Sequence, residues 1–484
     1  MATRRRYLAA LAGATVLATA LLTLSNGKYS SPLAAWLAPP LLVRLLRDLP
    51  RGRGLLAGYI ACWIACAIQW SGVFPLTGSL FYAASGLLCL LFFVPYLADR
   101  LLAPGLQGLR GTWTLPTTMV IAEFLFARFG HFGVWGSLAY SQASVLPLAQ
   151  VAAVTGTYGV TFLIGWTASL ANLVVEDRRE GRALPALAVG LWAGVFAAVL
   201  GCGLARVSPP RSGAPTMRVA MISPRTDDNA NFRIHNAPVT QDSLFARSSR
   251  AARDGATLVV WPECASAIFA SDEAGWIERA GRFASRERVF LAAPYAARVS
   301  DGDPRYENKM VLIDPNGELL WKYRKSRPVP GMEGLVIPGD GRVAMFATPE
   351  LRLAGMICFD ADHPDLMRQL GGHADLLLLP SEDWKEISDL HLAMARLGAI
   401  EYGVPIVRST LHGRSAAIDP FGRVLGSRSD EGPGDHVLLV DIVPGEVPTL
   451  YRRVHDLFVA LCAIAFVTLL AAALARRRGR RPPE

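Results

Sequence analysis

The sequence predicts a multi-pass α-helical membrane domain joined to an α/β domain, and three observations predict this combination. Hydrophobic residues make up 52% of the 484 residues. Charged residues reach only 18%, whereas soluble domains carry about 25%. Long apolar stretches fill residues 1–206 and 455–475, while residues 217–447 alternate β-rich runs, helical patterns and turns. We therefore expect a transmembrane domain at 1–206, an α/β domain at 217–447 and a C-terminal transmembrane helix at 455–475.

Eight apolar stretches are candidates for membrane spans, because a helix needs about 20 apolar residues to cross a bilayer. They cover residues 8–24, 31–46, 55–71, 73–97, 113–128, 158–176, 184–204 and 455–475. The second is short and contains Pro39 and Pro40, and the fifth carries Glu123 and Arg128. We expect about eight spans. Alternatively, the first stretch is a cleaved signal peptide, since it follows three arginines and contains Ala18-Thr-Ala20.

The basic residues indicate how the chain crosses the membrane. The net charge of +9 comes largely from Arg4–Arg6 and from an arginine cluster at 476–481, so it gives no reason to expect a nucleic-acid partner. If the N-terminus is cytoplasmic, every second loop carries the excess of Lys and Arg that is typical of cytoplasmic loops. We therefore expect both termini in the cytoplasm and residues 217–447 on the outer face, which in a bacterium is the periplasmic face of the inner membrane.

Cysteine and histidine spacing gives no sign of a metal site. Among the seven cysteines only Cys264 and Cys358 lie in polar sequence, and they lack CxxC spacing. The eight histidines form no HExxH motif. We expect no metal and no cofactor.

Residues 217–447 read as one α/β domain, because strand-like runs alternate with amphipathic helices. The strand-like runs are 218–222, 257–261, 289–293, 310–313, 353–359, 375–379, 405–409, 415–418 and 437–440. The helices are expected at 240–253, 272–286, 363–370 and 388–402. Asp314-Pro-Asn-Gly317 and Asp419-Pro-Phe-Gly422 are turn tetrapeptides that suit hairpins.

Three side chains of this domain suit acyl transfer. Glu263 and Cys358 each close a strand-like run, and Lys325 follows a hairpin strand. A carboxylate, an ammonium and a thiol supply a base, a cation for an oxyanion and a nucleophile. Taken singly, each has an ordinary explanation: a cysteine in core packing, a glutamate in a solvated turn and a lysine among surface charges.

The motifs around these side chains resemble those of the nitrilase, or carbon–nitrogen hydrolase, superfamily. They are Trp261-Pro-Glu263, Lys325 followed eight residues later by Glu333, and Gly355-Met-Ile-Cys358-Phe359. Nearly the whole chain is similar to the membrane branch of that superfamily, the bacterial apolipoprotein N-acyltransferases. The further matching segments are 148–150, 157–162, 391–396, 399–401 and 415–419. The resemblance implies eight spans and an αββα sandwich between the last two.

The resemblance also implies roles for individual residues. Glu263 would be the general base, Lys325 the oxyanion-stabilising cation and Cys358 the nucleophile. Glu333 would orient Lys325 and the substrate amine, the Phe359 backbone N–H would complete the oxyanion site, and Trp261 would help to orient the substrate. Segments 330–334 and 381–387 could close over the pocket, with Met332, Glu382 and Trp384 as pocket residues.

The implied reaction moves a fatty acyl chain from a phospholipid, through a Cys thioester, to the α-amine of the N-terminal diacylglyceryl cysteine of a lipoprotein. The implied donor is the sn-1 chain of phosphatidylethanolamine, and we expect a monomer. The chain departs from the family pattern at Phe359, where tyrosine is usual, and in the segments 330–333, 381–384 and 411–413. These departures affect the pocket walls. The identity of the substrate is therefore less well determined than the type of reaction.

Several alternatives stay open at this point. The chain could be a membrane-tethered amidase or hydrolase, or a non-catalytic relative that binds lipoproteins. Cys264 could be a rival nucleophile. Cys358 could instead pair with a histidine at position 363, 391 or 412. Near the end of the fifth stretch, Glu123, Arg128 and His131 could contact a lipid headgroup or extend to the membrane interface.

Overall fold

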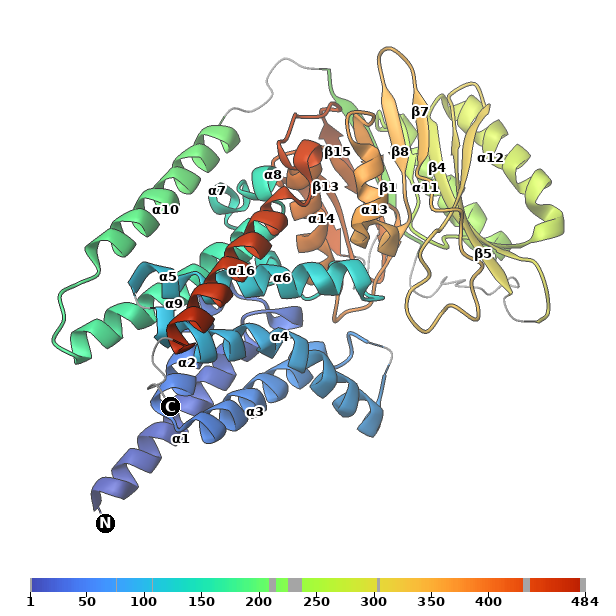
Figure 1. Ribbon diagram of the computed structural model, residues 1–484. Helices are drawn as coiled ribbons and strands as arrows, with labels where there is room; N and C mark the ends of the chain where they lie inside the picture. Colours follow the sequence, from blue (N-terminus) through green and yellow to red (C-terminus); the bar gives the residue numbers. More distant parts are fainter. Residues whose placement is uncertain are drawn as a thin grey trace. The chain divides into compact units, whose positions relative to one another are not determined.

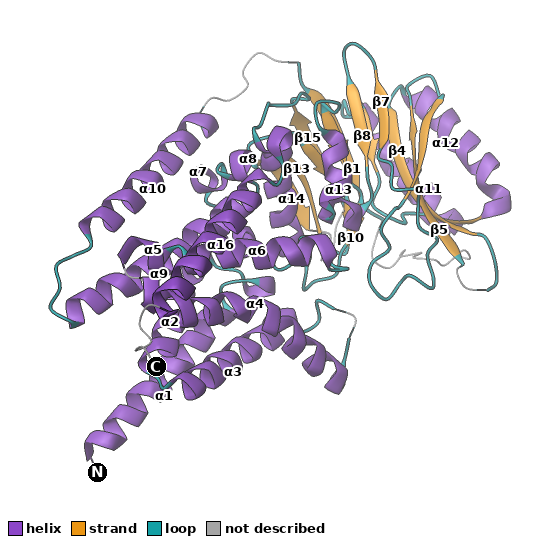
Figure 2. Cartoon of the chain, viewed as in Figure 1, coloured by secondary structure: helices purple, strands orange, loops and turns teal. Residues whose placement is uncertain are grey.

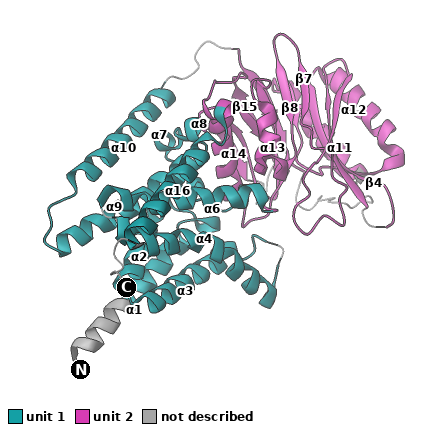
Figure 3. Ribbon diagram, in the orientation of Figure 1, with its two compact units in different colours: residues 1–130, 134–208, 454–484 teal, residues 131–133, 209–453 magenta. Residues whose placement is uncertain are grey.

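The computed structural model describes residues 2–74, 76–106, 108–208, 215–224, 237–302, 305–429 and 436–478. The chain divides into two compact units (Figure 3). The membrane unit comprises Met1–Gly130, Val134–Ser208 and Val454–Glu484, and the α/β unit comprises His131–Gly133 and Pro209–Arg453. The expected transmembrane domain at 1–206, periplasmic α/β domain at 217–447 and C-terminal transmembrane helix at 455–475 stay predictions.

The membrane unit contains one long helix at each of the eight stretches expected to span the membrane (Figure 1). These helices are α1 (Ala2–Thr23), α2 (Pro32–Asp48), α3 (Arg51–Trp70), α4 (Gly78–Leu106), α6 (Thr114–Phe129), α9 (Tyr158–Arg179), α10 (Ala186–Val207) and α16 (Leu457–Arg478). The short helices α5 (Gly108–Thr112), α7 (Leu146–Ala149) and α8 (Ala152–Thr155) lie in the connections.

Five of these helices, among the described residues, are long and apolar enough to cross a membrane. They are α3, α4, α9, α10 and α16. Helices α2 and α6 have only 17 and 16 residues, and α1 contributes a shorter apolar segment at 12–23. The chain is therefore a membrane protein with five supported spans, and the count of eight stays a prediction.

A buried ion pair joins three helices of the membrane unit. Arg47 of α2 places Nη2 2.6 Å from Oδ2 of Asp99 in α4 and Nη1 3.2 Å from Oε1 of Glu176 in α9. The side chains of Arg47 and Asp99 are 9% and 2% exposed. Because an unpaired charge at such a position is costly, the pair fixes which faces of the helices meet.

Glu123 of α6 neither contacts the membrane interface nor presents a free carboxylate. It is 7% exposed and accepts hydrogen bonds from Ser137 Oγ at 2.9 Å, from the Leu138 backbone N–H at 2.9 Å and from Thr161 Oγ1 at 2.9 and 3.0 Å. The carboxylate therefore ties the 137–138 segment to α6 and α9. This burial argues against both explanations considered for Glu123 from the sequence, a headgroup contact and extension to the interface.

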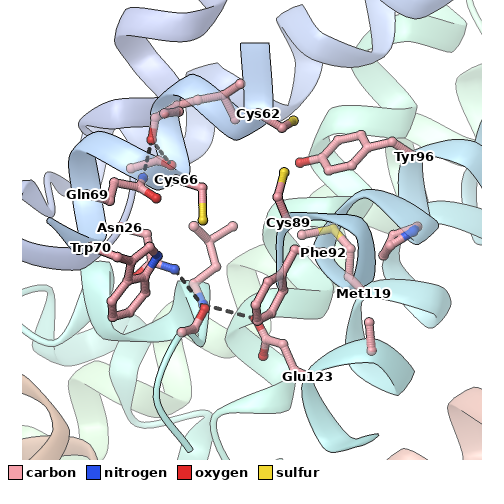
Figure 4. Close-up of a pocket in the computed structure, with 17 residues that line it drawn as sticks. Asn26, Cys62, Cys66, Gln69, Trp70, Cys89, Phe92, Tyr96, Met119 and Glu123 are labelled. Carbon is pink, nitrogen blue, oxygen red and sulfur yellow. Dashed lines mark hydrogen bonds between the residues drawn. The ribbon is translucent and has the colours of Figure 1, made fainter. Parts of the chain in front are cut away.

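A small apolar cavity lies inside the membrane unit (Figure 4). Its volume is about 120 Å³, and the thiols of Cys62, Cys66 and Cys89 lie on its wall. Two polar lining residues are already engaged, since Asn26 Nδ2 donates to the Gly136 carbonyl at 2.7 Å and Gln69 Nε2 donates to the Leu22 carbonyl at 2.5 Å. The cavity resembles in size the engineered apolar cavities of about 150 Å³ that bind benzene.

The α/β unit contains two large β-sheets and one two-stranded sheet (Figure 2). The first has the order β15-β1-β2-β4-β5-β6, with β3 also paired to β4. Its strands are β1 (Met217–Ile222), β2 (Leu258–Val260), β3 (Ala267–Phe269), β4 (Phe290–Arg298), β5 (Tyr306–Ile313), β6 (Leu319–Arg324) and β15 (Val437–Ile442). The neighbours β1, β2 and β4 are parallel, and β15, β5 and β6 extend the sheet with antiparallel pairs.

The second sheet repeats this arrangement in the order β14-β13-β11-β9-β8-β7. Its strands are β7 (Ala344–Ala347), β8 (Arg352–Gly355), β9 (Leu376–Leu378), β11 (Ile406–Arg408), β13 (Arg414–Ile418) and β14 (Val424–Ser429). The neighbours β8, β9 and β11 are parallel. The short strands β10 (Ser381–Glu382) and β12 (Thr410–Leu411) form a parallel pair of their own.

Helices cover one face of each large sheet. Leu244 of α11 (Ala237–Arg253) and Phe283 of α12 (Glu273–Glu287) share a core with the first sheet. Leu366 of α13 (Pro364–Met367) and Ala399 of α14 (Ser388–Tyr402) share a core with the second.

The opposite faces of the sheets pack together. A Cβ on Gly355 of β8 would lie only 2.4 Å from the Trp321 ring of β6, so glycine is required at this close approach. The predicted αββα sandwich is therefore confirmed.

The two turn tetrapeptides form as expected. Gly317 has φ +92° and its N–H donates to the Asp314 carbonyl at 2.9 Å, and Gly422 has φ +78° and donates to Asp419 at 2.9 Å. The first turn joins β5 to β6, and the strand β6 leads directly to Lys325. A local sequence signal thus fixes the position of a residue of the candidate site.

Candidate active site

Strand ends bring Glu263, Lys325 and Cys358 to one region of the α/β unit. Glu263 follows β2, and Lys325 follows β6. Cys358 begins a 3-10 turn, η6 (Cys358–Asp362), which two residues separate from the end of β8. The three residues are 4%, 4% and 3% exposed. A buried carboxylate, ammonium and thiol are therefore present together, as predicted.

The carboxylate of Glu263 is the centre of the site. Its Oε1 atom accepts from Lys325 Nζ at 2.6 Å and from Asn308 Nδ2 at 2.6 Å. Its Oε2 atom accepts from the backbone N–H of Glu382 at 3.0 Å. A carboxylate oxygen has two lone-pair sites, so Oε1 is occupied and Oε2 retains one site. Oε2 is therefore the atom that can take a proton.

The ammonium of Lys325 is held charged by its surroundings. Burial disfavours the charge, but Glu263, Cys358 and Asp360 together outweigh burial and raise the pKa of Lys325 above its usual range. The backbone is fixed as well, because the Lys325 N–H donates to the Asn308 carbonyl at 2.8 Å. Lys325 is thus a permanent cation beside the carboxylate.

Cys358 has a backbone conformation that side chains rarely adopt. Its φ is +50°, in the left-handed region, and its N–H donates to the Pro380 carbonyl at 2.9 Å. The Sγ atom lies 3.7 Å from the Glu382 carbonyl oxygen, which can accept the thiol proton in a hydrogen bond. Burial raises the pKa of the thiol well above its usual range and Glu263 raises it further, while Lys325 lowers it. The surroundings of Cys358 therefore favour the neutral thiol.

Asp360 connects the loop of the lysine to the turn of the cysteine. Its Oδ1 atom accepts from the backbone N–H groups of Ser326 at 3.0 Å and Arg327 at 2.7 Å. Its Oδ2 atom accepts from Tyr323 OH at 2.7 Å and from the Ile357 N–H at 3.2 Å. Burial raises the pKa of Asp360 to about 6. Because these contacts flank Lys325 and Cys358, Asp360 sets the spacing between them.

Phe359 supplies a backbone donor next to the nucleophile. Within the described part of the chain, no acceptor is found for its N–H, so this group is available to a ligand. The ring is 5% exposed and packs edge-to-face against His363 at 4.8 Å between ring centroids. The structure is therefore compatible with the expected oxyanion donor, and the ring itself is part of the core.

Two residues expected to orient the substrate lie elsewhere. The ring of Trp261 is 0% exposed, and its Nε1 donates to Ser248 Oγ at 3.0 Å, so it packs the end of β2 and cannot contact a substrate. Glu333 is exposed, and its carboxylate accepts from the Gly331 N–H at 2.6 Å. Lys325 is bonded to Glu263 and not to Glu333, so the structure does not bring Glu333 to the lysine.

The residues expected in a mobile pocket wall differ among themselves. Met332 and Trp384 are half-buried, as pocket residues can be. Glu382 is different, because its backbone belongs to β10 and contacts both Glu263 and Cys358. Ser381 and Asp383 are buried as well. Residues 381–383 are thus held by contacts within the fold, and the closing of segment 330–334 or 381–387 over the pocket stays a prediction.

The rival nucleophile has no partner set of its own. Cys264 is 3% exposed and packs with Ala296 and Tyr306 in a small apolar cluster. Burial raises the pKa of its thiol well above the usual range, and the neighbouring Glu263 raises it further. Burial and the direction of the pKa shift are the same for Cys358, so the feature that sets Cys264 apart is its packing in this apolar cluster.

His391 is the histidine that lies near Cys358. The Sγ of Cys358, a carboxylate oxygen of Asp383 and a ring nitrogen of His391 lie within 4.8 Å of one another. However, the His391 nitrogens face Asp383 Oδ1 at 2.9 Å and Asp362 Oδ2 at 3.3 Å, and both Asp383 oxygens accept from Arg408. Both oxygens of Asp383 and the Nδ1 atom of His391 are thus engaged within the protein, which argues against a metal ion at this place. The pKa of His391 is raised to about 9, which favours its charged form, and a charged imidazole has no lone pair to take the proton of Cys358.

Three of these site residues were missed in the sequence. Asn308 lies between the charged residues Glu307 and Lys309, just before the apolar run 310–313, so it carried no local signal. Asp383 and Arg408 carried no local signal, because their pairing joins segments 25 residues apart.

Comparison with known proteins agrees with this architecture. Residues 218–451 match the carbon-nitrogen hydrolase family model, and residues 18–170 match the model of the apolipoprotein N-acyltransferase N-terminal domain. The chain is 28% identical to the apolipoprotein N-acyltransferase of Geobacter metallireducens over 98% of this chain and 96% of the relative. It is 30% identical to that of Bradyrhizobium diazoefficiens, over 76% of this chain and 74% of the relative.

A solved amidase of the nitrilase superfamily from Nesterenkonia aligns with 48% of this chain and 92% of its own, with 21% identity and a TM-score of 0.40. The αββα fold, the buried carboxylate, ammonium and thiol, and the family match define a carbon–nitrogen hydrolase domain carried by a membrane protein. The matches to both halves narrow this class further. The chain belongs to the apolipoprotein N-acyltransferase family.

Proposed function

We propose that this chain is an enzyme that transfers a fatty acyl chain from a phospholipid to the N-terminal amine of lipoproteins. Family membership supports this function, since the relatives are named for it. The observation that carries the mechanism is the site itself. Glu263 binds Lys325 at 2.6 Å, and the backbone of Glu382 contacts Glu263 through its N–H and Cys358 through its carbonyl oxygen.

In the first half-reaction, Sγ of Cys358 attacks the ester carbonyl of the phospholipid. The S–C bond forms, the ester C–O bond breaks, and a lysophospholipid leaves. Because the resting thiol is neutral, its proton must pass to a base as the bond forms, and Oε2 of Glu263 has the free lone-pair site for it. Glu263 then delivers this proton to the leaving oxygen.

The oxyanion of this step needs donors near the nucleophile. The Lys325 ammonium and the Phe359 backbone N–H are the two candidates, one charged and one neutral. Donors fixed before the reaction stabilise the developing charge without reorganising, which is usually the largest contribution to such catalysis.

In the second half-reaction, the α-amine of a diacylglyceryl cysteine attacks the thioester. The C–N bond forms, the C–S bond breaks, and the amine proton returns through Glu263 to Sγ of Cys358. Glu333 would guide the amine from its exposed position, and the half-buried Met332 and Trp384 would line the approach. Water must be kept from the thioester, because hydrolysis would waste the acyl chain.

The membrane helices suit this chemistry because both substrates are anchored in lipid. Moving an acyl chain into water costs about 0.8 kcal/mol per CH₂ group. We place the enzyme in the bacterial inner membrane, with both termini in the cytoplasm, the α/β unit in the periplasm and eight spans. The alternation of basic loops supports this orientation. We further propose that the enzyme is a monomer and that the acyl donor is the sn-1 chain of phosphatidylethanolamine.

The test follows acyl transfer on the purified full-length protein. Vesicles of phosphatidylethanolamine with chains of known mass are added, and intact-protein mass spectrometry should show one acyl chain on the wild type and none on Cys358→Ala. A synthetic peptide with an N-terminal diacylglyceryl cysteine should then remove the label and gain an amide. Release of free fatty acid without peptide acylation would favour a hydrolase, and a protein that never acquires the label would be a binding protein.

A further inference from the structure

We propose that Asp383, held by Arg408 and His391, is a positioning residue that aligns the base and the nucleophile for thioester formation. The proposal rests on the proposed function, because it assigns Asp383 to the first half-reaction at the same site. Asp383 would act through the backbone N–H and carbonyl of its neighbour Glu382. It would not contact the substrate.

The peptide groups of Glu382 connect the two reacting side chains. The Glu382 N–H donates to Oε2 of Glu263 at 3.0 Å, and its carbonyl oxygen lies 3.7 Å from Sγ of Cys358. One residue's backbone thus contacts the oxygen that takes the proton and the sulfur that gives it. Any movement of this residue changes the relation between base and nucleophile.

The backbone around Glu382 is held by few ladder bonds. Strand β10 has two residues and pairs only with β12, also of two residues. On either side, the Ser381 N–H donates to Ser409 and the Asp383 N–H donates to Leu411, both at 2.8 Å. Such a short strand pair needs an additional anchor to keep a fixed position.

The side chain of Asp383 provides this anchor. Arg408 of β11 donates from Nη2 to Oδ1 at 2.6 Å and to Oδ2 at 2.8 Å, and His391 of α14 lies 2.9 Å from Oδ1. The Asp383 and Arg408 side chains are 0% exposed. Because breaking a buried pair leaves an uncompensated charge, the arrangement of the three side chains is strongly constrained.

The network returns to the nucleophile on its other side. His391 Nε2 lies 3.3 Å from Oδ2 of Asp362, the last residue of the η6 turn that begins with Cys358. The contacts therefore form a closed path from Cys358 through η6 to His391, on to Asp383, and back to Cys358 through Glu382. Both elements that determine the place of the sulfur are tied to one buried cluster.

The charge of Asp383 argues that its role is positional. The cluster contains two carboxylates, Asp362 and Asp383, and two cations, Arg408 and His391, so it is nearly neutral. Burial and Arg408 lower the pKa of His391, but the two carboxylates outweigh them and the pKa is raised to about 9. The negative charge of Asp383 raises the pKa of the Cys358 thiol, so it opposes formation of the nucleophilic thiolate. A residue that promoted thiolate formation electrostatically would carry a positive charge.

The experiment therefore separates thiolate formation from acyl transfer in Asp383→Asn. Removing the negative charge should lower the pKa of Cys358 and speed its alkylation by iodoacetamide near neutral pH. The same variant should slow acyl-enzyme formation from phosphatidylethanolamine vesicles about tenfold or more, because displacements of about 1 Å can cost on the order of a hundredfold. The phospholipid concentration giving half-maximal rate should stay within about twofold.

Asp375→Asn is the matched control. Asp375 precedes β9, the strand that leads to the β10 segment, and pairs with Arg352 through two bonds of 2.6 and 3.0 Å without contacting the site. This variant should lose stability but acylate within about twofold of the wild type. His391→Gln is the second test variant, because it keeps the Asp383–Arg408 pair and removes the connection to Asp362, so it should slow acylation even if Asp383→Asn fails to fold.

The outcomes are distinct. If the wild type forms no acyl-enzyme, the proposed function fails. If the wild type acylates and a folded Asp383→Asn protein acylates equally fast, only the positioning role fails. If Asp383→Asn does not fold, a folded His391→Gln protein that acylates as fast as the wild type has the same meaning. Slower acylation that simply follows slower alkylation would also overturn it, since the effect would then be electrostatic.

Discussion

The Nζ atom of Lys325 lies 2.6 Å from Oε1 of Glu263, and both side chains are only 5% exposed. Removing one member of a pair this buried typically costs 3–5 kcal/mol, because the other charge stays behind without a partner. The pair therefore links stability to catalysis at this site.

Glu263→Gln should remove the base and weaken the fold at once. The variant keeps the shape of the side chain but cannot accept the thiol proton, so acyl-enzyme formation should fall roughly 10²–10⁴-fold. Its thermal midpoint should also fall, since Lys325 loses its counter-charge. Intact-protein mass spectrometry and thermal unfolding in detergent measure the two effects. The exposed Glu278→Gln on α12 is the control, and equal acylation rates for the two variants would refute the assignment of the base.

Asp360→Asn should loosen the spacing between lysine and cysteine. The carboxylate accepts four hydrogen bonds, two of them from the backbone just after Lys325. Asparagine places an NH₂ group where one carboxylate oxygen of Asp360 accepts hydrogen bonds. This group would face other donors, at a cost of about 1–3 kcal/mol.

We expect a lower thermal midpoint and slower thioester formation in Asp360→Asn. The same mass-spectrometric assay measures thioester formation. The exposed pair Arg327–Asp365 supplies the control, because Asp365→Asn removes a bond of 2.5 Å outside the site. A folded Asp360→Asn protein with wild-type acylation would contradict the spacing role.

His391 predicts how stability depends on pH. Its pKa is raised to about 9 in the folded protein, through Asp362 and Asp383, against about 6.5 for an unperturbed histidine. The folded state therefore binds a proton that the unfolded state releases, so this stabilisation is complete below about pH 6.5 and is lost as the pH rises through about 9.

The difference in thermal midpoint between wild type and His391→Gln should accordingly shrink from pH 6 to pH 10. Other titrating groups act on both proteins and cancel in this difference, while His373→Gln reports the effect of an arbitrary histidine. A constant difference over the whole range would show that His391 is not charged in the folded state.

Trp261→Phe should affect stability alone. The substitution keeps an aromatic ring in the core but removes the N–H that donates to Ser248 Oγ at 3.0 Å, at a cost of about 1 kcal/mol. Acylation measured well below the unfolding temperature should stay within about twofold of the wild type. Ser248→Ala removes the same bond from the other side, so the two effects should not add. A large loss of acylation in Trp261→Phe would restore the substrate-orienting role that the burial of this ring argues against.

The sequence predicts elements well where a local pattern determines them. Helix α14 was expected at 388–402 and spans Ser388–Tyr402, and both turn tetrapeptides form as expected. The short strands β3, β10 and β12 were missed, because two or three residues carry too little periodicity to be recognised. The longer strands β7 and β14 were missed as well. The run 353–359 was expected to be one strand, but β8 ends at Gly355 and Cys358 begins a turn with positive φ.

The candidate site was predictable in its reacting groups and not in its supports. Glu263, Lys325 and Cys358 stand at strand ends within recognisable motifs. Their support comes from Asp383 and from the Glu382 peptide, whose positions depend on pairing between distant segments. The burial of Trp261 was equally beyond the sequence, since a motif does not show which of its side chains faces the core.

Glu333→Gln should separate the two half-reactions. Glu333 is exposed and bonded to the Gly331 N–H, whereas Lys325 is held by Glu263, so the loss of this carboxylate should leave thioester formation unchanged. If Glu333 guides the acceptor amine, transfer from the acyl-enzyme to a diacylglyceryl peptide should slow about tenfold, because a charged hydrogen bond contributes about 1.5–3 kcal/mol. Single-turnover mass spectrometry follows both steps in one experiment. Glu350→Gln, an exposed glutamate between β7 and β8, should change neither step. Slower thioester formation in Glu333→Gln would instead indicate that the carboxylate moves to Lys325 when a phospholipid binds.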